Sequence, residues 1–247
     1  MQKYQIFTHD GIFHADDIFA IALIKVFLNC HDVVRTRDIS QKILDYPLRL
    51  VIDVGLNYNP ELGNFDHHQD PNLESSNVLV LNWLHNQKII SEELYQMLLP
   101  DFLEISQIDR FGYITPENKQ KFHVNKLIRS LNNMTFGWEQ ALGVATSYIR
   151  SVCEKYDNLL IARENWKNSP DITDKIKYVN CGKYPIDWQI WSDAEVLIFS
   201  ENLKYKVIGK TNLVFDNFKK FKINDIMAIV EDFSDAVILA KQSIQTT

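Results

Sequence analysis

Strand-like and helical segments alternate over the first 54 residues, and this alternation restricts the fold more than any other feature. Residues 3–8, 32–37 and 48–54 are short segments rich in β-forming side chains. The almost wholly apolar segment 18–28 separates the first two, and acidic residues precede it, which predicts a buried helix with carboxylates at its positive N-terminal end. A short amphipathic segment, 39–44, leads to the third strand. This order predicts a parallel sheet built from βαβ units.

The pattern becomes helical after residue 75. Helices are predicted from Ser75–Ser76 to about residue 87, and again after Ser91, with Pro100 interrupting or kinking the second one. One long helical pattern then runs from Gly137 to about residue 166.

The polar stretch 167–174 is the best candidate for a domain boundary. The segments 175–180, 195–200 and 204–210 beyond it favour strands, and 233–244 favours a closing helix. We therefore expect an α/β protein of two domains. A parallel-sheet, metal-binding catalytic domain with a helical extension occupies residues 1–166, and a smaller α+β domain that shapes substrate choice occupies residues 175–247.

Charge and cysteine content narrow the range of partners. The formal net charge is −6, and gripping a long nucleic-acid duplex requires clustered Lys and Arg, so we expect a short or small anionic substrate instead. Three widely spaced cysteines suggest no disulfide framework. No apolar run approaches the roughly 18 residues that span a membrane, and no signal peptide precedes the first strand. We expect a soluble cytoplasmic protein without a membrane partner.

Histidines and aspartates gather at the predicted ends of strands. Thr8-His9-Asp10-Gly11-Ile12-Phe13-His14-Ala15-Asp16-Asp17 follows the first strand, and Asp53 ends the third. Asp66-His67-His68 and Asp109 lie further along. Carboxylates and imidazoles are ligands for divalent metals, and one carboxylate can bridge two ions about 3.5–4 Å apart. The alternative is that these residues are helix caps and solvated loop residues, which we favour for Asp17 because acidic first-turn residues are common.

The adjacent histidines of the Asp66-His67-His68 run should have different roles. Neighbouring side chains in an extended segment point in opposite directions, so one histidine can bind metal while the other meets the substrate. A polar surface turn is the alternative for this run. The templates for phosphate loops, dinucleotide folds and serine hydrolases are absent from the sequence.

Four motifs together resemble the melanocyte-proliferating-gene (MYG) family. They are the 8–17 segment, Val34-Arg35-Thr36-Arg37-Asp38, Val51-Ile52-Asp53-Val54-Gly55 and Phe65-Asp66-His67-His68-Gln69. That family is related to the Asp-His-His phosphoesterases, which include RecJ-type exonucleases and family II inorganic pyrophosphatases. The resemblance covers about the first two-thirds of the chain and fades beyond the polar stretch.

The resemblance implies a two-metal phosphoesterase, usually manganese-dependent, with magnesium or cobalt as alternatives. His9, His14 and Asp53 hold one ion, and the second is held by Asp16, Asp53, His67 and Asp109. Asp53 is then the bridge, and His68 faces the substrate phosphate. Asp66 and Asp17 support the ligands without binding metal, and Asp66 orients a histidine. Arg35 and Arg37 are candidates for phosphate contacts, although residues on a strand are as often structural.

Two departures from the family pattern make Asp109 the least secure of these ligands. Ser106 stands where the family usually has an acid, and Arg110-Phe111-Gly112 replaces the usual Asn-Gly.

The function implied by the resemblance is a metal-dependent phosphodiesterase, a 3′–5′ exonuclease on short RNA. One alternative is a phosphohydrolase for a small substrate such as pyrophosphate, a cyclic dinucleotide or a sugar phosphate. A non-catalytic protein that binds metal or nucleotide is the other. The oligomeric state stays open, with a homodimer as one option.

Overall fold

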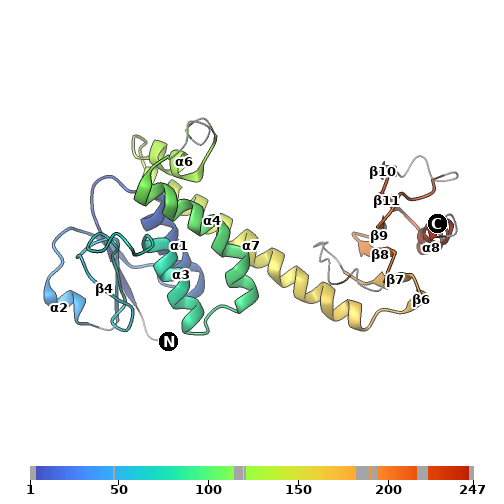
Figure 1. Cartoon of the computed structure of the whole chain (residues 1–247), viewed down its shortest axis with the longest axis horizontal. Coiled ribbons are helices and arrows are strands. Elements are labelled where there is room, and N and C mark those ends of the chain that lie inside the picture. The colour runs from blue at the N-terminus through green and yellow to red at the C-terminus, as the bar shows by residue number, and fades with distance from the viewer. Residues whose placement is uncertain are drawn as a thin grey trace. The chain divides into compact units, whose positions relative to one another are not determined.

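The chain forms two compact units that share one helix. The computed structural model describes residues 4–46, 48–113, 119, 121–181, 190, 194–215 and 222–244. The division falls between Cys153 and Glu154, inside helix α7 (Gly137–Lys167), which runs unbroken from one unit into the other (Figure 1). A domain boundary at residues 167–174, directly after this helix, remains a prediction. Each unit is described by itself below.

A five-stranded sheet forms the centre of the N-terminal unit. Its strand order is β2-β1-β3-β5-β4, and all neighbouring pairs are parallel except the edge pair β4–β5. The strands are β1 (Gln5–Thr8), β2 (Val33–Arg35), β3 (Arg49–Ile52), β4 (Tyr58–Asn59) and β5 (Asn64–Phe65). The predicted α/β class with a parallel N-terminal sheet is confirmed, whereas the two-residue strands β4 and β5 are too short to show a pattern in the sequence.

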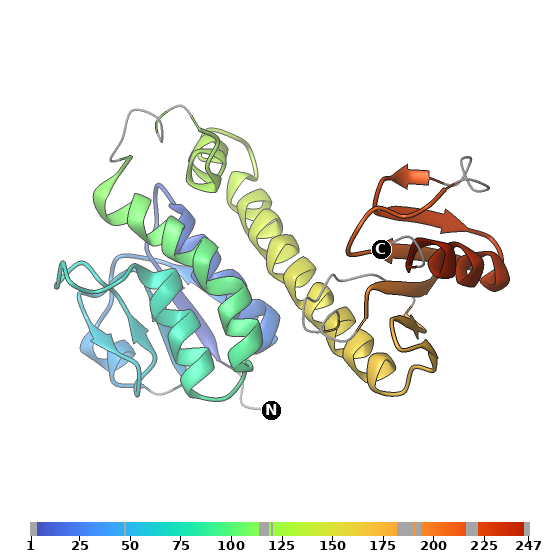
Figure 2. The same ribbon diagram turned by 45° about the vertical axis from the view of Figure 1, so that its right-hand side comes forward.

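Helices cover both faces of this sheet. They are α1 (Ala15–Phe27), α2 (Gln41–Leu44), α3 (Ser76–Asn86), α4 (Glu92–Phe111) and α6 (Val124–Leu131). Helices α1, α3 and α4 pack against one another, and Figure 2 shows α3 and α4 side by side in front of the strands. On the opposite face, Leu44 of α2 packs with Phe7, Val51 and Val54. Helix α4 continues through Pro100 to Phe111 without ending at the proline.

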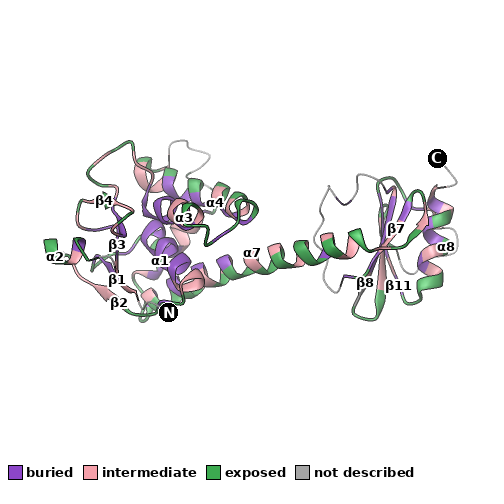
Figure 3. Cartoon of the chain, turned by 90° about the horizontal axis from the view of Figure 1, so that it is seen from below, coloured by how far each residue is buried: buried purple, intermediate pink, exposed green. Residues whose placement is uncertain are grey.

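Helix α1 is the most deeply buried element of this unit. Every residue from Ile18 to Ile24 is at most 2% exposed, and Figure 3 shows the helix as buried along most of its length. A helix that is apolar on all sides belongs inside a core. The acidic pair Asp16–Asp17 at its N-terminus is therefore carried into the interior, and both residues are fully buried.

The strand order places a topological switch point between β1 and β3. From β1 the chain passes through α1 to β2 on one side, and then returns through α2 to β3 on the other side. In open parallel sheets, ligands bind outside the carboxyl ends of strands at such a point. His9 directly follows β1 and Asp53 directly follows β3, so both residues lie at this position.

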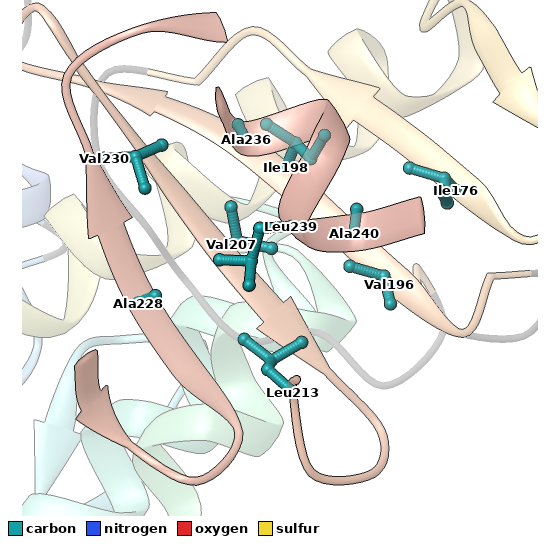
Figure 4. Packing of buried hydrophobic residues seen from close by; sticks show 10 residues of the cluster. All are labelled: Ile176, Val196, Ile198, Val207, Leu213, Ala228, Val230, Ala236, Leu239 and Ala240. Carbon is teal, nitrogen blue, oxygen red and sulfur yellow. The ribbon is translucent and has the colours of Figure 1, made fainter. Parts of the chain in front are cut away.

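The C-terminal unit is built on a mostly antiparallel sheet of order β10-β11-β9-β8-β7-β6, in which only β7–β8 is a parallel pair. Its strands are β6 (Asp171–Thr173), β7 (Ile176–Val179), β8 (Val196–Glu201), β9 (Lys204–Gly209), β10 (Lys222–Asn224) and β11 (Met227–Val230). The closing helix α8 (Phe233–Ile244) has the predicted bounds and packs Ala236, Leu239 and Ala240 onto the sheet (Figure 4). Ala162 and Trp166 of α7 pack with residues of the other face. The smaller α+β domain is thereby confirmed as a fold class.

Among the helices that the structure describes, none combines the length and the apolar character required to cross a bilayer.

Leu239→Ala should destabilise the protein by about 2–5 kcal/mol, because it leaves a cavity where α8 meets the sheet. Chemical denaturation measures the change in the free energy of unfolding. Leu203→Ala is the matched control, since Leu203 is 99% exposed whereas Leu239 is fully buried. The core described above would be contradicted if both substitutions had equal effects.

Candidate metal centre

The six predicted metal ligands come together at the switch point between β1 and β3. Their side chains, together with His68, form three overlapping groups in which all ligand atoms lie within 4.8 Å of one another. The groups are His9–His14–Asp53, Asp53–His67–His68 and His14–Asp16–Asp109. Asp53 and His14 each belong to two groups. Overlap of this kind, with a shared carboxylate, has the arrangement of a site for two neighbouring divalent ions.

Asp53 occupies the middle of the cluster and has an unusual backbone. Its φ angle is +56°, in the left-handed region that non-glycine residues seldom adopt and that is often found at functional sites. Its Oδ1 lies 3.3 Å from Nε2 of His67, and its Oδ2 lies 3.5 Å from Nε2 of His9. Burial alone would raise the pKa of Asp53, but His67 and His9 hold it well below its usual range. Each oxygen of this carboxylate therefore faces a different histidine.

Ser76 contacts the Asp53 carboxylate and fixes its orientation. The Ser76 hydroxyl, in the first turn of α3, lies 3.0 Å from Oδ1 of Asp53 and 2.8 Å from the carbonyl oxygen of Phe65, in donor geometry to both. The sequence shows Ser75-Ser76 only as a helix start, and Ser75 is indeed the N-cap. The sequence alone does not distinguish a serine that caps a helix from a serine that contacts Asp53. The contact depends on how α3 packs beside β3.

His67 faces three carboxylates. Its Nε2 lies 3.7 Å from Oδ2 of Asp16 and 3.4 Å from Oδ2 of Asp109, in addition to the contact with Asp53. Within the described residues, neither this nitrogen nor either carboxylate oxygen of Asp16 has a partner at hydrogen-bonding geometry, although all three atoms are buried. Burying such groups without partners is costly unless a cation satisfies them. The residues present therefore fit a divalent ion.

Burial and mutual repulsion raise the pKa values of two carboxylates in the cluster. Burial raises the pKa of Asp16 well above its usual value, and the charges of Asp53 and Asp109 raise it further. Burial also raises the pKa of Asp109, with the charge of Asp53 adding to the effect. Without a cation, the cluster thus favours the protonated forms of Asp16 and Asp109.

Asp17 both caps α1 and contacts a predicted ligand. Its Oδ1 accepts a hydrogen bond from the backbone N–H of His14 at 3.0 Å, while its Oδ2 lies 3.1 Å from Nε2 of His9. Asp17 therefore has both expected roles. Its Oδ1 caps the helix, and its Oδ2 contacts the predicted ligand His9. Burial would lower the pKa of His9, but Asp17 and Asp53 outweigh this effect and raise it to about 10.

Asp66 orients His68 rather than His67. Oδ1 of Asp66 lies 2.7 Å from Nδ1 of His68 and accepts from its backbone N–H, while Oδ2 accepts from the N–H of Leu56. The His68 ring is half-exposed, with 53% of the side chain accessible. The bond to Asp66 raises the pKa of His68, and burial opposes this in part. A half-exposed imidazole that is held in place by Asp66 can donate a hydrogen bond to an anion.

The two arginines that are candidates for phosphate contacts hold the loop that carries His9 and His14. Arg35 donates to the carbonyl oxygens of His9 and Gly11, and its guanidinium lies 4.2 Å from the ring centroid of Trp138. Arg37 pairs with Asp10 at 3.2 Å. These contacts give both residues a structural role in the loop, and a direct phosphate contact remains a prediction.

A polar network takes the place of the acid that the family usually has at position 106. The Ser106 hydroxyl donates to Glu74 at 2.6 Å and accepts from the backbone N–H of Ser75, and Arg110 pairs with Glu74 at 2.8 Å. This network joins α4 to the segment before α3. Asp109 lies on the same helix and is brought to His67, so the structure gathers this least secure ligand with the others.

A family model described as an uncharacterised protein family, UPF0160, the MYG1 exonucleases, matches residues 5–91. That segment, about a third of the chain, is similar to this family. The MYG1 protein of Chlamydia trachomatis is 41% identical over 95 residues, which are 37% of this chain and 32% of that protein. The MYG1 exonuclease of Rattus norvegicus is 39% identical over 71 residues, or 28% and 18% of the two chains. The MYG1 protein of Dictyostelium discoideum is 31% identical over 143 residues, or 57% and 40%. The MYG1 resemblance thus spans less than half the length of each of these relatives.

Two solved structures are similar to the chain at low identity. The pGpG-specific phosphodiesterase PggH from Vibrio cholerae gives a TM-score of 0.39 at 11% identity, covering 100% of this chain and 98% of that one. RecJ of Thermus thermophilus in complex with Mn²⁺ gives 0.31 at 13% identity, covering 99% and 52%.

Metal binding should release protons at pH 7, and the affinity for Mn²⁺ should rise between pH 6 and pH 8. In the metal-free protein the pKa of His9 is raised to about 10, so its imidazole is protonated at pH 7, whereas a metal ligand must be neutral. Calorimetric titration in two buffers of different ionisation enthalpy measures the protons released. A heat that is the same in both buffers would contradict the proposed ligand role of His9.

Ser76→Ala should weaken Mn²⁺ binding by about 10–100-fold, the usual cost of removing a group that orients a metal ligand. Competition with a chelating dye measures the affinity without any need for turnover. Ser151→Ala, an exposed hydroxyl on α7, is the control and should leave the affinity unchanged. Equal affinities for the two variants would show that Ser76 does not position Asp53.

Proposed function

We propose that this protein is a metal-dependent phosphodiesterase, a 3′–5′ exonuclease on short RNA with a dinuclear centre of manganese type. The observation that carries this proposal is the cluster around the buried Asp53, three overlapping groups of carboxylates and imidazoles in each of which the ligand atoms lie within 4.8 Å of one another. Three of these buried atoms have no hydrogen-bond partner among the described residues. The exonuclease name of the rat, mouse and human relatives supports the assignment. Because the chain spans only 18% of the length of each, the activity of the whole protein is our proposal.

The ligands divide between two ions. His9, His14 and Asp53 would hold one ion, and Asp16, Asp53, His67 and Asp109 would hold the other. Divalent ions at such a site lower the pKa of a bound water and neutralise charge on the phosphoryl oxygens.

Residues around the ligands fix the orientation of the site. Asp53 presents one oxygen to each histidine and is held in place by Ser76. Asp66 fixes the ring of His68 so that its exposed edge is free to contact a phosphate oxygen. Preorganised, charged groups of this kind stabilise developing negative charge in phosphoryl transfer.

The charge of the protein supports a short substrate. The net charge is −6, so positive potential for an anion would come from bound cations rather than from a basic surface. A short oligonucleotide reaches such a localised site without the extended phosphate contacts that a duplex needs.

A small-substrate phosphohydrolase is the second candidate, and the size of the neighbouring cavity favours it. The cavity bounded by His14 and Asp109 has a volume of about 290 Å³, near the lower end of the range of roughly 300–1,000 Å³ for ligand sites. Pyrophosphate, a cyclic dinucleotide or a sugar phosphate are the substrates in question. A protein that only binds metal or nucleotide is the third reading, and the full set of ligand-type residues argues against it.

Asp53→Asn should abolish manganese-dependent hydrolysis of RNA oligomers and of a chromogenic phosphodiester, because it removes the carboxylate that both ions share. We expect the rate to fall by at least about 10³-fold, in keeping with the several kcal/mol that metal catalysis supplies. Asp157→Asn, on the exposed side of α7, should retain the activity.

Three measurements complete this test. Elemental analysis of the wild-type protein in manganese-replete medium should find about two ions per chain, and finding none would contradict the site. A panel of RNA oligomers, pyrophosphate, cyclic dinucleotides and sugar phosphates shows which substrate class is hydrolysed. The 5′- and 3′-labelled oligomers in that panel report the direction of degradation.

A further inference from the structure

A cavity of about 290 Å³ extends from the metal ligands towards helix α6 within the N-terminal unit. One wall carries His14 and Asp109, which belong to the proposed metal centre. A second part of the lining, called the second wall below, consists of Asn125 and Arg129 of α6 and of Tyr113, beyond the end of α4. The proposed roles of the metal ligands use only the first wall, so the second wall is available for another part of the ligand.

Arg129 brings a positive charge to this cavity. Its side chain is exposed, and within the part of the chain that the structure describes no ion pair or hydrogen bond engages its guanidinium. The other arginines around the site differ in this respect, since Arg35 and Arg37 are bound to the 9–14 loop and Arg110 pairs with Glu74. A free guanidinium is suited to binding a phosphate group.

Asn125 adds a polar atom that lacks a partner. Its Nδ2 donates to the carbonyl oxygen of Ile105 at 3.3 Å, which leaves its Oδ1 as the free acceptor. This oxygen is buried and has no hydrogen-bond partner within the part of the chain that the structure describes. Buried acceptors are normally satisfied, so this atom calls for a donor from water or from a ligand. Hydroxyl and amino groups of a nucleoside are donors of this kind.

We propose that this cavity binds the nucleotide next to the scissile phosphate, with Arg129 holding the phosphate on the far side of that nucleotide. The inference rests on the proposed function, because it assigns the scissile phosphate to the metal ligands at the first wall. Asn125 accepts a hydrogen bond from the nucleoside, and Tyr113 supplies an aromatic surface. The volume accommodates one nucleotide rather than several. The preferred ligands are therefore short oligonucleotides that carry a second phosphate one nucleotide away from the scissile one.

Nucleoside bisphosphates test this arrangement because they carry two phosphates on one nucleoside. Calorimetric titration of the metal-loaded protein compares adenosine 3′,5′-bisphosphate with adenosine 5′-monophosphate and adenosine 3′-monophosphate, and chromatography afterwards verifies that each ligand is intact. The bisphosphate should bind about tenfold more tightly than either monophosphate, since a charge-assisted contact is added. Arg129→Gln should remove this advantage while leaving the affinity for the tighter monophosphate within about twofold.

Arg150→Gln is the matched control, an exposed arginine in the same unit that does not border this cavity. It should keep the tenfold preference, and Arg129→Lys should keep part of it. The proposal is overturned if the bisphosphate binds no more tightly than the monophosphates, or if Arg129→Gln retains the preference. The binding measurement does not require turnover, so it separates failure of the subsite from failure of the phosphodiesterase assignment, which the chromogenic substrate reports.

Discussion

The contact between Asp53 and the histidines on either side of it is the interaction on which the site depends. The left-handed backbone at the end of β3 turns this carboxylate to a position where one oxygen faces His9 and the other faces His67. Ser76 fixes the carboxylate from the start of α3. Because β1, β3 and α3 each contribute one of these groups, the site forms only when the parallel sheet and its helices have assembled.

A second set of residues surrounds the ligands and fixes their positions. Asp17 caps α1 and contacts His9, Asp66 orients His68, and Arg35 ties the 9–14 loop to Trp138. Each of these residues uses one part of its side chain for the fold and another for the position of a ligand. This double use explains why so many charged side chains are found in the interior of the unit. Replacing any of them by an apolar residue would alter both the packing and the orientation of a ligand.

The sequence allowed the elements of the site to be predicted but not their contacts. His9 and Asp53 could be identified because they end apolar strands, and parallel strands bring such ends to one edge. The role of Ser76 could not be foreseen, since a serine at a helix start is indistinguishable from an ordinary cap. The same holds for β4 and β5, whose pairing comes from tertiary packing rather than from any local preference. The sequence left Arg35 equally suited to a phosphate contact and to a structural role, and its hydrogen bonds to His9 and Gly11 and its contact with Trp138 depend on tertiary structure.

The buried, mutually repelling carboxylates of the cluster also link the metal supply to the stability of the fold. A folded N-terminal unit without cations holds Asp16 and Asp109 close to Asp53, and ionising these two buried carboxylates there costs free energy. An ion that binds only the folded state lowers that state's free energy, by about 2.7 kcal/mol when its concentration is 100 times its dissociation constant. The concentration of available divalent metal would then determine what fraction of the protein is folded and how long it withstands proteolysis.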